Sequence, residues 1–294
     1  MPDRYGPAMR ISNGCGGVVM AAEYDETGNN VKYRAEEIGV LVPERRELLL
    51  DRLRRDGRVI AKDVAGELGL SEDSVRRDLR EMAAAGLCQR VYGGAVPASP
   101  AVADYATRRG VAVDSKARVA AAAVPLIAPG STVILDGGTT ALAVASALPR
   151  ELEATVVTHS PTVAAALVDH PRVEVYVLGG RLFKHSAVTC GAAAVEAAAA
   201  VNADLFLLGV TGVHPDSGLT TGDADEAAMK RALARRAADT YVLASTEKIG
   251  AASPFTVLPL ADVAGIVTDA PPTHEVVARL VELGVPVVQA AVPR

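Results

Sequence analysis

Residues 132–148, TVILDGGTTALAVASAL, contain a pattern that could bind an anion. An apolar run ends at Asp136, two glycines make a turn, and an Ala/Leu/Val segment of helical period begins with Thr139 and Thr140. A glycine turn that leads into a helix exposes backbone N–H groups at the positive end of the helix dipole, where a phosphate can be held. The pattern predicts a phosphate loop, but it does not distinguish an enzyme from a sensor.

A second group of chemistry-bearing residues lies in SEDSVRRDLREM, residues 71–82. Its apolar positions recur at helical spacing and form an inward face made of Val75, Leu79 and Met82. The outward side carries three arginines: Arg76, Arg77 and Arg80. Arginine can form two hydrogen bonds to a guanine edge or clamp DNA phosphates. The alternative is a solvated helix whose arginines pair with acidic neighbours, namely Asp73, Asp78 and Glu81.

The elements around these arginines favour DNA binding because they match a helix-turn-helix with a wing. One helix is expected in PERRELLLDRLRRDG and a short second helix in KDVAGELG, which Gly69 ends. Ser71 can cap the third helix, and Gly86 closes it. LCQRVYGGAV alternates and then turns at its two glycines, as a small wing would.

After this module, apolar strand runs alternate with helical segments. The expected strands are 132–136, 154–158, 173–178, 204–210, 240–244, 263–268 and 286–291. The expected helices are 114–127, 140–148, 161–169, 190–201, 223–238 and 273–283. This alternation predicts a parallel sheet covered on both faces. Ligands of such sheets bind beyond the carboxyl ends of the strands, where the LDGGTT loop lies.

Four segments follow from these patterns. Residues 1–41 contain the loop-like clusters SNGCGG and DETGNN and are expected to be a disordered leader. Residues 42–97 form the winged helix-turn-helix domain. Residues 98–113 include most of the Pro/Ala-rich PASPAVAD (residues 97–104) and are expected to be a linker. Residues 114–294 form the α/β domain.

The stretch GELGLSEDSVRRDLREMAAAGLCQRVYGGAV resembles the winged helix-turn-helix of the DeoR family of bacterial transcriptional regulators. LDGGTT, VVTHS, VLGGRL, GLTTGDADEAAMKRAL and ASTEKIG follow in the order of that family's sensor domain, so the resemblance extends to about residue 270. It implies an α/β protein, with an N-terminal winged helix-turn-helix domain followed by a Rossmann-like domain similar to ribose-5-phosphate isomerase. It also implies a repressor of a sugar operon, with operator DNA and a phosphorylated sugar as partners.

The resemblance also implies which residues act. The implied DNA-binding residues are Ser71, Ser74, Arg76, Arg77, Arg80, Arg90, Tyr92 and Gly93. The implied phosphate end of the pocket is Asp136, Gly137, Gly138, Thr139, Thr140, Thr158, His159 and Ser160. Around the phosphate end, one wall and four inward-reaching side chains complete the pocket: Gly180, Arg181, Asp225, Glu226, Lys230 and Lys248. The alternative for Asp225, Glu226 and Lys230 is a surface pair at helical spacing.

Four positions depart from the family's common pattern. His159 stands where the family commonly has Asn, and Ile60 stands at a helix N-cap that commonly carries Ser or Thr. A lost cap costs on the order of 1 kcal/mol. Thr211 and Ser245 each replace a frequent Asp, which removes plausible general bases. The departures count against a sugar-phosphate isomerase, which is the competing interpretation; an adaptor without DNA contact would leave the arginines unexplained.

Composition sets further limits. A net charge of −5 excludes a generally basic polymer binder but permits a local basic surface. Cys15, Cys88 and Cys190 are far apart, and His185 near Cys190 supplies too few ligands for a metal, so no metal or other cofactor is expected. No signal peptide or membrane span is evident, which predicts a cytoplasmic protein with no membrane partner. A single winged module makes a small DNA interface, so a homodimer or homotetramer is expected.

Overall fold

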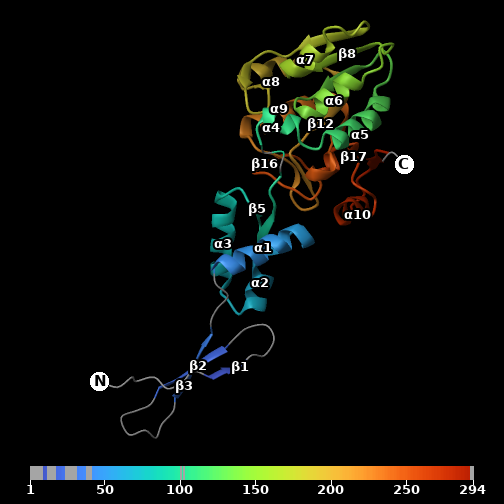
Figure 1. Cartoon of the computed structure of the whole chain (residues 1–294). Helices are drawn as coiled ribbons and strands as arrows, with labels where there is room; N and C mark the ends of the chain where they lie inside the picture. The colour runs from blue at the N-terminus through green and yellow to red at the C-terminus, as the bar shows by residue number, and fades with distance from the viewer. Residues whose placement is uncertain are drawn as a thin grey trace. The chain divides into compact units, whose positions relative to one another are not determined.

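The computed structural model of the chain describes residues 9–11, 18–23, 32–37, 42–99, 101 and 103–291. The chain divides into two compact units, residues 1–95 and residues 96–294 (Figure 1).

The first 41 residues contain three strands, β1 (Met9–Ile11), β2 (Val18–Glu23) and β3 (Lys32–Glu37), which pair in the antiparallel order β1-β2-β3. This differs from the disordered leader that we expected for residues 1–41. The expectation rested on the clusters SNGCGG and DETGNN, and such turn-forming residues are as typical of the loops between short antiparallel strands as of a disordered segment. The other residues of this segment lie outside the described residues.

Residues 42–97 form three helices and a small sheet of order β4-β6-β5. The elements are α1 (Val42–Asp56), β4 (Val59–Ile60), α2 (Ala61–Leu68), α3 (Glu72–Ala84), β5 (Cys88–Val91) and β6 (Gly94–Pro97). Gly69 ends α2 in the left-handed conformation, and the Ser71 side chain accepts a hydrogen bond from the Ser74 N–H at the start of α3. The apolar face predicted for α3 is buried, so the predicted helices and wing are confirmed.

The second unit is built on seven parallel strands in the order β18-β17-β15-β12-β7-β8-β9. Their bounds are β7 (Thr132–Leu135), β8 (Ala154–Thr158), β9 (Val173–Val177), β12 (Ala203–Gly209), β15 (Ala237–Leu243), β17 (Gly265–Thr268) and β18 (Val287–Gln289). All seven strands expected from the sequence are present. Counted in chain order, the arrangement begins 3-2-1-4-5-6, the Rossmann order, and the direction of the order reverses between β7 and β12.

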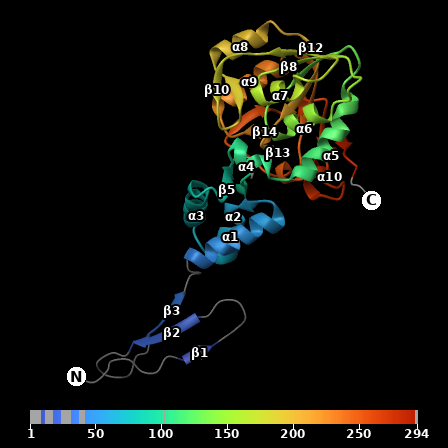
Figure 2. The same ribbon diagram turned by 45° about the horizontal axis from the view of Figure 1, so that its top comes forward.

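Six helices cover the two faces of this sheet (Figure 2). They are α5 (Val113–Ala123), α6 (Thr139–Ala147), α7 (Pro161–Leu167), α8 (Ala192–Ala199), α9 (Ala224–Ala234) and α10 (Glu275–Glu282). α5, α6 and α7 pack in one hydrophobic core, while α8, α9 and α10 pack in the other. Successive residues of a strand alternate between the cores, as Ile134 and Leu135 do, which is the geometry of a doubly covered sheet.

The structure adds short elements that the sequence did not predict. They are η2 (Val124–Leu126), β10 (Arg181–Phe183), β11 (Val188–Cys190), β13 (Gly212–His214), β14 (Gly218–Thr221), η3 (Thr246–Lys248), β16 (Phe255–Leu258) and η4 (Leu260–Asp262). β10 pairs with β11, and β13, β14 and β16 form a separate antiparallel sheet. Strands of three or four residues are too short for a period of two to stand out.

Residues 98–113, expected to be a linker, pack as part of the second unit. Ala98 bridges to Ala252, and the Ser99 hydroxyl donates to the carbonyl of Thr211. A short helix, α4 (Tyr105–Arg109), follows, capped by the Asp104 carboxylate. The linker expectation is corrected because the segment's small side chains allow its backbone to dock closely, and small side chains are equally typical of linkers. In the described part of the chain, no helix is long and apolar enough to cross a membrane.

Candidate functional site

The predicted recognition helix α3 presents its arginines to solvent. Arg76, Arg77 and Arg80 are all exposed. Arg76 holds an i,i+4 ion pair with Glu72, with 2.6 Å between Nη2 and Oε1. Among the described residues, the side chains of Arg77 and Arg80 have no hydrogen-bond or ion-pair partner. Two guanidinium groups of α3 are therefore available to contact DNA without first breaking an ion pair within the described residues.

The acidic residues of α3 serve its packing rather than its arginines. Asp78 is buried and accepts a hydrogen bond from Arg45 of α1, while Glu81 pairs with Arg46 of the same helix. Both ion pairs join α1 to α3. The structure therefore differs from the alternative of a solvated helix that neutralises its own arginines, because Asp78 and Glu81 already have partners on α1.

The wing, which follows α3 in the sequence, has further exposed side chains. Arg90 is exposed on β5, and Tyr92 is fully exposed in the turn between β5 and β6. Gly93 follows with φ of +79°, a backbone conformation that favours glycine. Ser71 and Ser74 have a structural part as well, because their hydroxyl oxygens lie 2.9 Å apart at the start of α3.

A polar pocket opens in the second unit at the carboxyl ends of β7 and β12, where the strand order reverses. Doubly wound sheets bind ligands at this topological position. The lining residues are Ala101, Arg108, Val111, Lys116, Gly137, Gly138, Thr139, Thr140, Gly209, Val210, Thr211, Thr221, Glu226, Lys230, Glu247 and Lys248. The structure thus brings together seven of the predicted effector residues: Gly137, Gly138, Thr139, Thr140, Glu226, Lys230 and Lys248.

The loop after β7 directs the start of α6 at this pocket. Gly138 is the N-cap with φ of +92°, and no side chain caps the helix. Its first N–H groups are therefore free to meet an anion, which the helix dipole also favours. Gly137 is a glycine for another reason: a Cβ there would come within 2.0 Å of the Val188 side chain. Gly137 therefore lets the loop pack closely against Val188.

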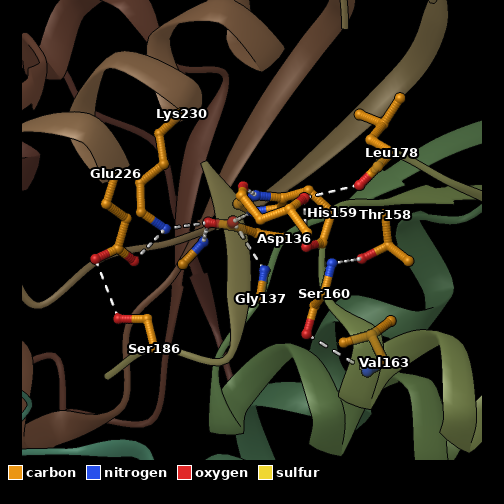
Figure 3. A network of polar contacts seen from close by, with 12 residues as sticks. Asp136, Gly137, Thr158, His159, Ser160, Val163, Leu178, Ser186, Glu226 and Lys230 are labelled. Carbon is orange, nitrogen blue, oxygen red and sulfur yellow. Dashed lines mark hydrogen bonds and ion pairs between the residues drawn. The ribbon is translucent and has the colours of Figure 1, made fainter. Parts of the chain in front are cut away.

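Asp136 lies beneath the loop at the centre of a buried polar network (Figure 3). One carboxylate oxygen accepts from His159 Nε2 at 2.7 Å and from the Gly137 N–H at 2.8 Å. The other oxygen accepts from Lys230 Nζ at 2.6 Å and from the Gly209 N–H at 2.8 Å. Four donors on one carboxylate fix the ends of β7 and β12 to each other and to α9.

The charges of this network support one another. Burial alone would raise the pKa of Asp136, but the Lys230 ammonium and the His159 ring hold that pKa well below its usual range. Burial likewise opposes the charge of Lys230, yet Asp136 and Glu226 raise its pKa. Lys230 Nζ lies 3.3 Å from Glu226, whose other oxygen accepts from Ser186 and Thr221 at 3.2 Å. The i,i+4 pair of Glu226 and Lys230 is therefore buried in the pocket wall rather than on the surface.

Lys248 is the predicted residue whose placement most favours an anion. It is the buried last residue of η3, the short helix that follows β15, and its Nζ donates to the Thr140 hydroxyl at 3.0 Å. Burial lowers its pKa to about 8, and although Glu247 acts in the opposite direction, the cations Lys116, Arg108 and Lys230 reinforce the decrease. Three cations and one carboxylate therefore act on Lys248, so the local charge is net positive and favours an anion.

Three charged residues of the lining were not predicted from the sequence: Arg108, Lys116 and Glu247. Lys116 Nζ donates to the carbonyls of Arg108, at 2.7 Å, and of Val111. One Glu247 oxygen accepts from the Ser245 hydroxyl at 2.6 Å, whereas Oε2 is buried without a partner among the described residues. Glu247 adjoins the predicted Lys248, so proximity could have indicated it. Arg108 and Lys116 lie outside every quoted motif, so no local signal indicates them.

Like Asp136, three further residues expected at the phosphate end lie behind the pocket. Thr158, His159 and Ser160 are fully buried and absent from its lining. His159 is turned toward Asp136, while Ser160 caps α7 and donates to the Ala187 carbonyl at 3.1 Å. Hydrogen bonds within the protein already occupy these side chains, and a direct contact with the effector stays a prediction. They support the loop rather than line the cavity.

The expected wall of Gly180, Arg181 and Asp225 is also outside the pocket. Arg181 and Asp225 form an exposed ion pair with 3.4 Å between Nη2 and Oδ2. Gly180 packs closely, since a Cβ there would approach Ala194 to 3.0 Å. Asp225 faces solvent because it is adjacent to Glu226 on α9, and neighbouring residues of a helix point in different directions.

Thr211 occupies the pocket wall without a free hydroxyl. Its Oγ1 lies 3.0 Å from the Thr220 carbonyl oxygen and 2.7 Å from the Ser253 hydroxyl. Ser245 is fully buried and bonded to Glu247. The two positions at which the sequence lacks an expected Asp therefore hold hydroxyls engaged within the protein.

Comparison with known proteins agrees with both units. Residues 45–101 match a DeoR-like helix-turn-helix domain, and residues 111–270 match a DeoR C-terminal sensor domain. The transcriptional regulator GlpR of Haloferax volcanii is 33% identical over 73% of this chain and 84% of its own length. The putative aga operon transcriptional repressor of Escherichia coli O157:H7 is 32% identical over 71% and 80%. The glycerol-3-phosphate regulon repressor of Escherichia coli K12 is 27% identical over 81% and 95%.

Among solved structures, ribose 5-phosphate isomerase A of Methanocaldococcus jannaschii aligns at 18% identity over 46% of this chain and 54% of its own, with a TM-score of 0.35. That score is too low to argue from, so the assignment rests on the two family models and the relatives. The three relatives named above are a transcriptional regulator and two repressors, which supports the regulator interpretation over the isomerase alternative. The chain belongs to the DeoR family of transcriptional regulators.

Proposed function

We propose that this protein is a repressor that binds operator DNA through α3 and the wing, and that a phosphorylated sugar or a related phosphorylated metabolite controls it. Two relatives support the class of regulated gene by their names, the putative aga operon repressor and the glycerol-3-phosphate regulon repressor.

The DNA-binding half rests on the exposed arginines of α3. A guanidinium without an acidic partner can form two hydrogen bonds to a guanine or clamp a phosphate at little cost. Arg77 and Arg80 meet this condition among the described residues, while Arg76 must leave or share Glu72. One winged module buries little DNA, so useful affinity requires at least a dimer on paired half-sites. Light scattering and footprinting test this, and tight binding of one half-site by a monomer would contradict it.

The effector half rests on one observation: an uncapped helix N-terminus and buried Lys248 converge on the pocket at the switch point of the sheet. Backbone N–H groups, the Thr139 and Thr140 hydroxyls and an ammonium suit a phosphate dianion. Glu247 supports the sugar part of the ligand. Its buried Oε2 lacks a donor among the described residues, and a ligand hydroxyl would supply one.

Calorimetry on the full chain tests the ligand class. The panel consists of ribose 5-phosphate, glucose 6-phosphate, fructose 1-phosphate and glycerol 3-phosphate, each beside its unphosphorylated parent, with and without operator. We expect at least one phosphorylated member to bind, its parent to bind much more weakly, and operator affinity to change on binding. By linkage, a ligand that alters operator affinity must bind the free and DNA-bound forms unequally. Equal affinity for a sugar and its phosphate would refute the proposal, and turnover of any member would restore the isomerase.

A further inference from the structure

The segment between the wing and α5 carries a side chain that the proposed function does not yet use. Arg108 lies on α4 and lines the pocket, although its neighbours in sequence showed no binding motif. Its Nη1 lies 3.6 Å from the position that a Cβ on Gly138 would occupy, so the guanidinium lies against the turn that opens α6. This is the place where an anion at the helix N-terminus would sit.

The Arg108 guanidinium is only partly satisfied. Nη2 donates to the His185 carbonyl at 3.2 Å. Nε is buried and has no partner among the described residues, and burial lowers the pKa of the side chain. A structural arginine with its donors used would need nothing more, whereas this one retains an unused donor and has no ion-pair partner among the described residues. A phosphate would satisfy both.

The pocket is narrow where α4 lies against the loop that precedes α6. Its free space is only about 20 Å³, enough for roughly one water molecule. Asp136 and its four donors hold the walls formed by the ends of β7 and β12, and Lys230 of α9 belongs to the same network. α4 is the exception, since it buries none of its five residues. A ligand therefore gains space most readily by moving α4.

Lys116 connects the pocket to the end of α4. Its ammonium lines the cavity and donates to the carbonyls of Arg108 and Val111, which end or follow the helix. An anion that attracts Lys116 competes with those carbonyls. Both cations that the sequence reading missed thus link ligand binding to the same short helix.

We propose that Arg108 binds the phosphate of the effector, and that the rearrangement this requires moves α4 within the segment that joins the α/β domain to the wing. The proposal rests on the proposed function and deepens it, because it names the residue and the element through which the ligand acts on DNA binding. The connection between α4 and the wing is the backbone itself, because α4 begins eight residues after Pro97, the last residue of β6.

Variants of α4 test the first half of the proposal. Arg108→Ala removes the guanidinium, Arg108→Lys keeps the charge without the planar fork, and Arg109→Ala is the matched control on the exposed neighbour. Inorganic phosphate and the phosphorylated panel members are titrated into each full-length variant by calorimetry. We expect Arg108→Ala to weaken phosphate binding about ten- to hundredfold, Arg108→Lys to restore part of it, and Arg109→Ala to match the wild type.

A fluorescent reporter tests the second half. The chain contains no tryptophan, so Tyr105→Trp places a single, selectively excitable tryptophan on α4. Tyr176→Trp, on an exposed position of β9, is the control. We expect saturating phosphate or sugar phosphate to shift the emission of the α4 reporter and not that of the β9 reporter. In the Arg108→Ala variant, operator affinity should no longer change when phosphate or sugar phosphate is added.

The outcomes separate this inference from the proposed function. If the wild type binds neither inorganic phosphate nor any phosphorylated panel member, the proposed function and this inference both fail. If the wild type binds them and Arg108→Ala binds equally well, only the assignment of Arg108 fails. Binding that leaves the Tyr105→Trp emission unchanged overturns the movement of α4.

Discussion

The two units arrange positive charge in opposite ways. On α3, Arg77 and Arg80 are exposed and have no partner among the described residues. In the pocket, Lys230 and Lys248 expose only 2% and 6% of their surface and are bonded within the protein. The first arrangement suits a long polyanion that meets many solvated charges, and the second suits one small anion that must be desolvated.

This difference has consequences for what each site senses. Exposed charges are screened by salt, so DNA binding through α3 should depend steeply on ionic strength. Buried charges are screened much less, but burial shifts their pKa values, as it does for Lys248. The α3 surface should therefore respond mainly to salt and the pocket mainly to pH.

The largest expected effect is the loss of the buried network in Asp136→Asn. Lys230 would keep its charge in a buried site without its main counter-ion, and breaking a buried pair costs about 3–5 kcal/mol. The free energy of unfolding, measured by urea denaturation with circular dichroism, should fall by that amount. Asp225→Asn is the matched control, because its ion pair with Arg181 is exposed and should contribute little. Equal effects of the two substitutions would show that burial does not distinguish them.

The next effect belongs to the exposed surface. Arg77→Ala should weaken operator binding by about 1–3 kcal/mol if Arg77 reads a base, with relaxed specificity at that base. A phosphate contact would instead weaken all sequences alike and reduce the salt slope by about 1. Fluorescence anisotropy with operator and scrambled DNA at several salt concentrations separates the two. Arg150→Ala, an exposed arginine of the α/β domain, should change neither quantity.

Sequence reading found the regular parts of the fold in both units. In the second unit, the seven parallel strands and their helices have strongly periodic apolar residues. In the first unit, Gly69 ends α2 and Ser71 caps α3, as predicted. Residues 98–113 were misread because Pro/Ala composition is the same in a free linker and in a segment that packs on a domain. The difference lies in partners distant in sequence, such as Thr211 for Ser99.

The site was predictable in its loop and less so around it. The loop follows a strand, so its place at the sheet edge is dictated by topology. Which neighbouring side chains face the cavity depends on competition for hydrogen bonds. His159 turned to Asp136 and Ser160 capped α7, while Arg108 entered from a segment with no recognisable motif.

The pocket should show the pH dependence that the α3 surface lacks. Lys248 has a pKa of about 8 without ligand, and a bound phosphate dianion would raise it. Above pH 8 the free protein must therefore take up a proton to bind phosphate, and affinity should fall by up to about tenfold per pH unit. Near pH 7 a sugar phosphate is mostly a dianion and Lys248 is mostly charged, so affinity should change least there.

Calorimetry in buffers of different ionisation enthalpy measures that proton uptake directly. Lys248→Met should remove the decline that begins near pH 8 and lower affinity below it. The charged groups that face Lys248 are Glu247, Lys116, Arg108 and Lys230, and the pKa of Lys116 is also lowered by burial. Lys116→Met is therefore the comparison variant, and it should retain the decline near pH 8. Persistence of that decline in Lys248→Met would assign it to another group.

The smallest effect concerns helix ends in the first unit, where α3 has a side-chain cap and α2 has none. Ile60 is the N-cap of α2 in an extended conformation, and it forms no cap hydrogen bond. The wing supplies one substitute, since the Ala61 N–H donates to the Gly93 carbonyl at 2.9 Å, but the next amides of the first turn gain nothing from Ile60.

Ile60→Thr keeps the β-branch that suits β4 and adds a hydroxyl, and Ile60→Val has the same shape without the hydroxyl. Thr should stabilise α2 relative to Val by about 1 kcal/mol, which is roughly a fivefold slowing of hydrogen exchange in the α2 amides of the full chain. Equal exchange in the two variants would mean that the wing backbone already caps α2 in full.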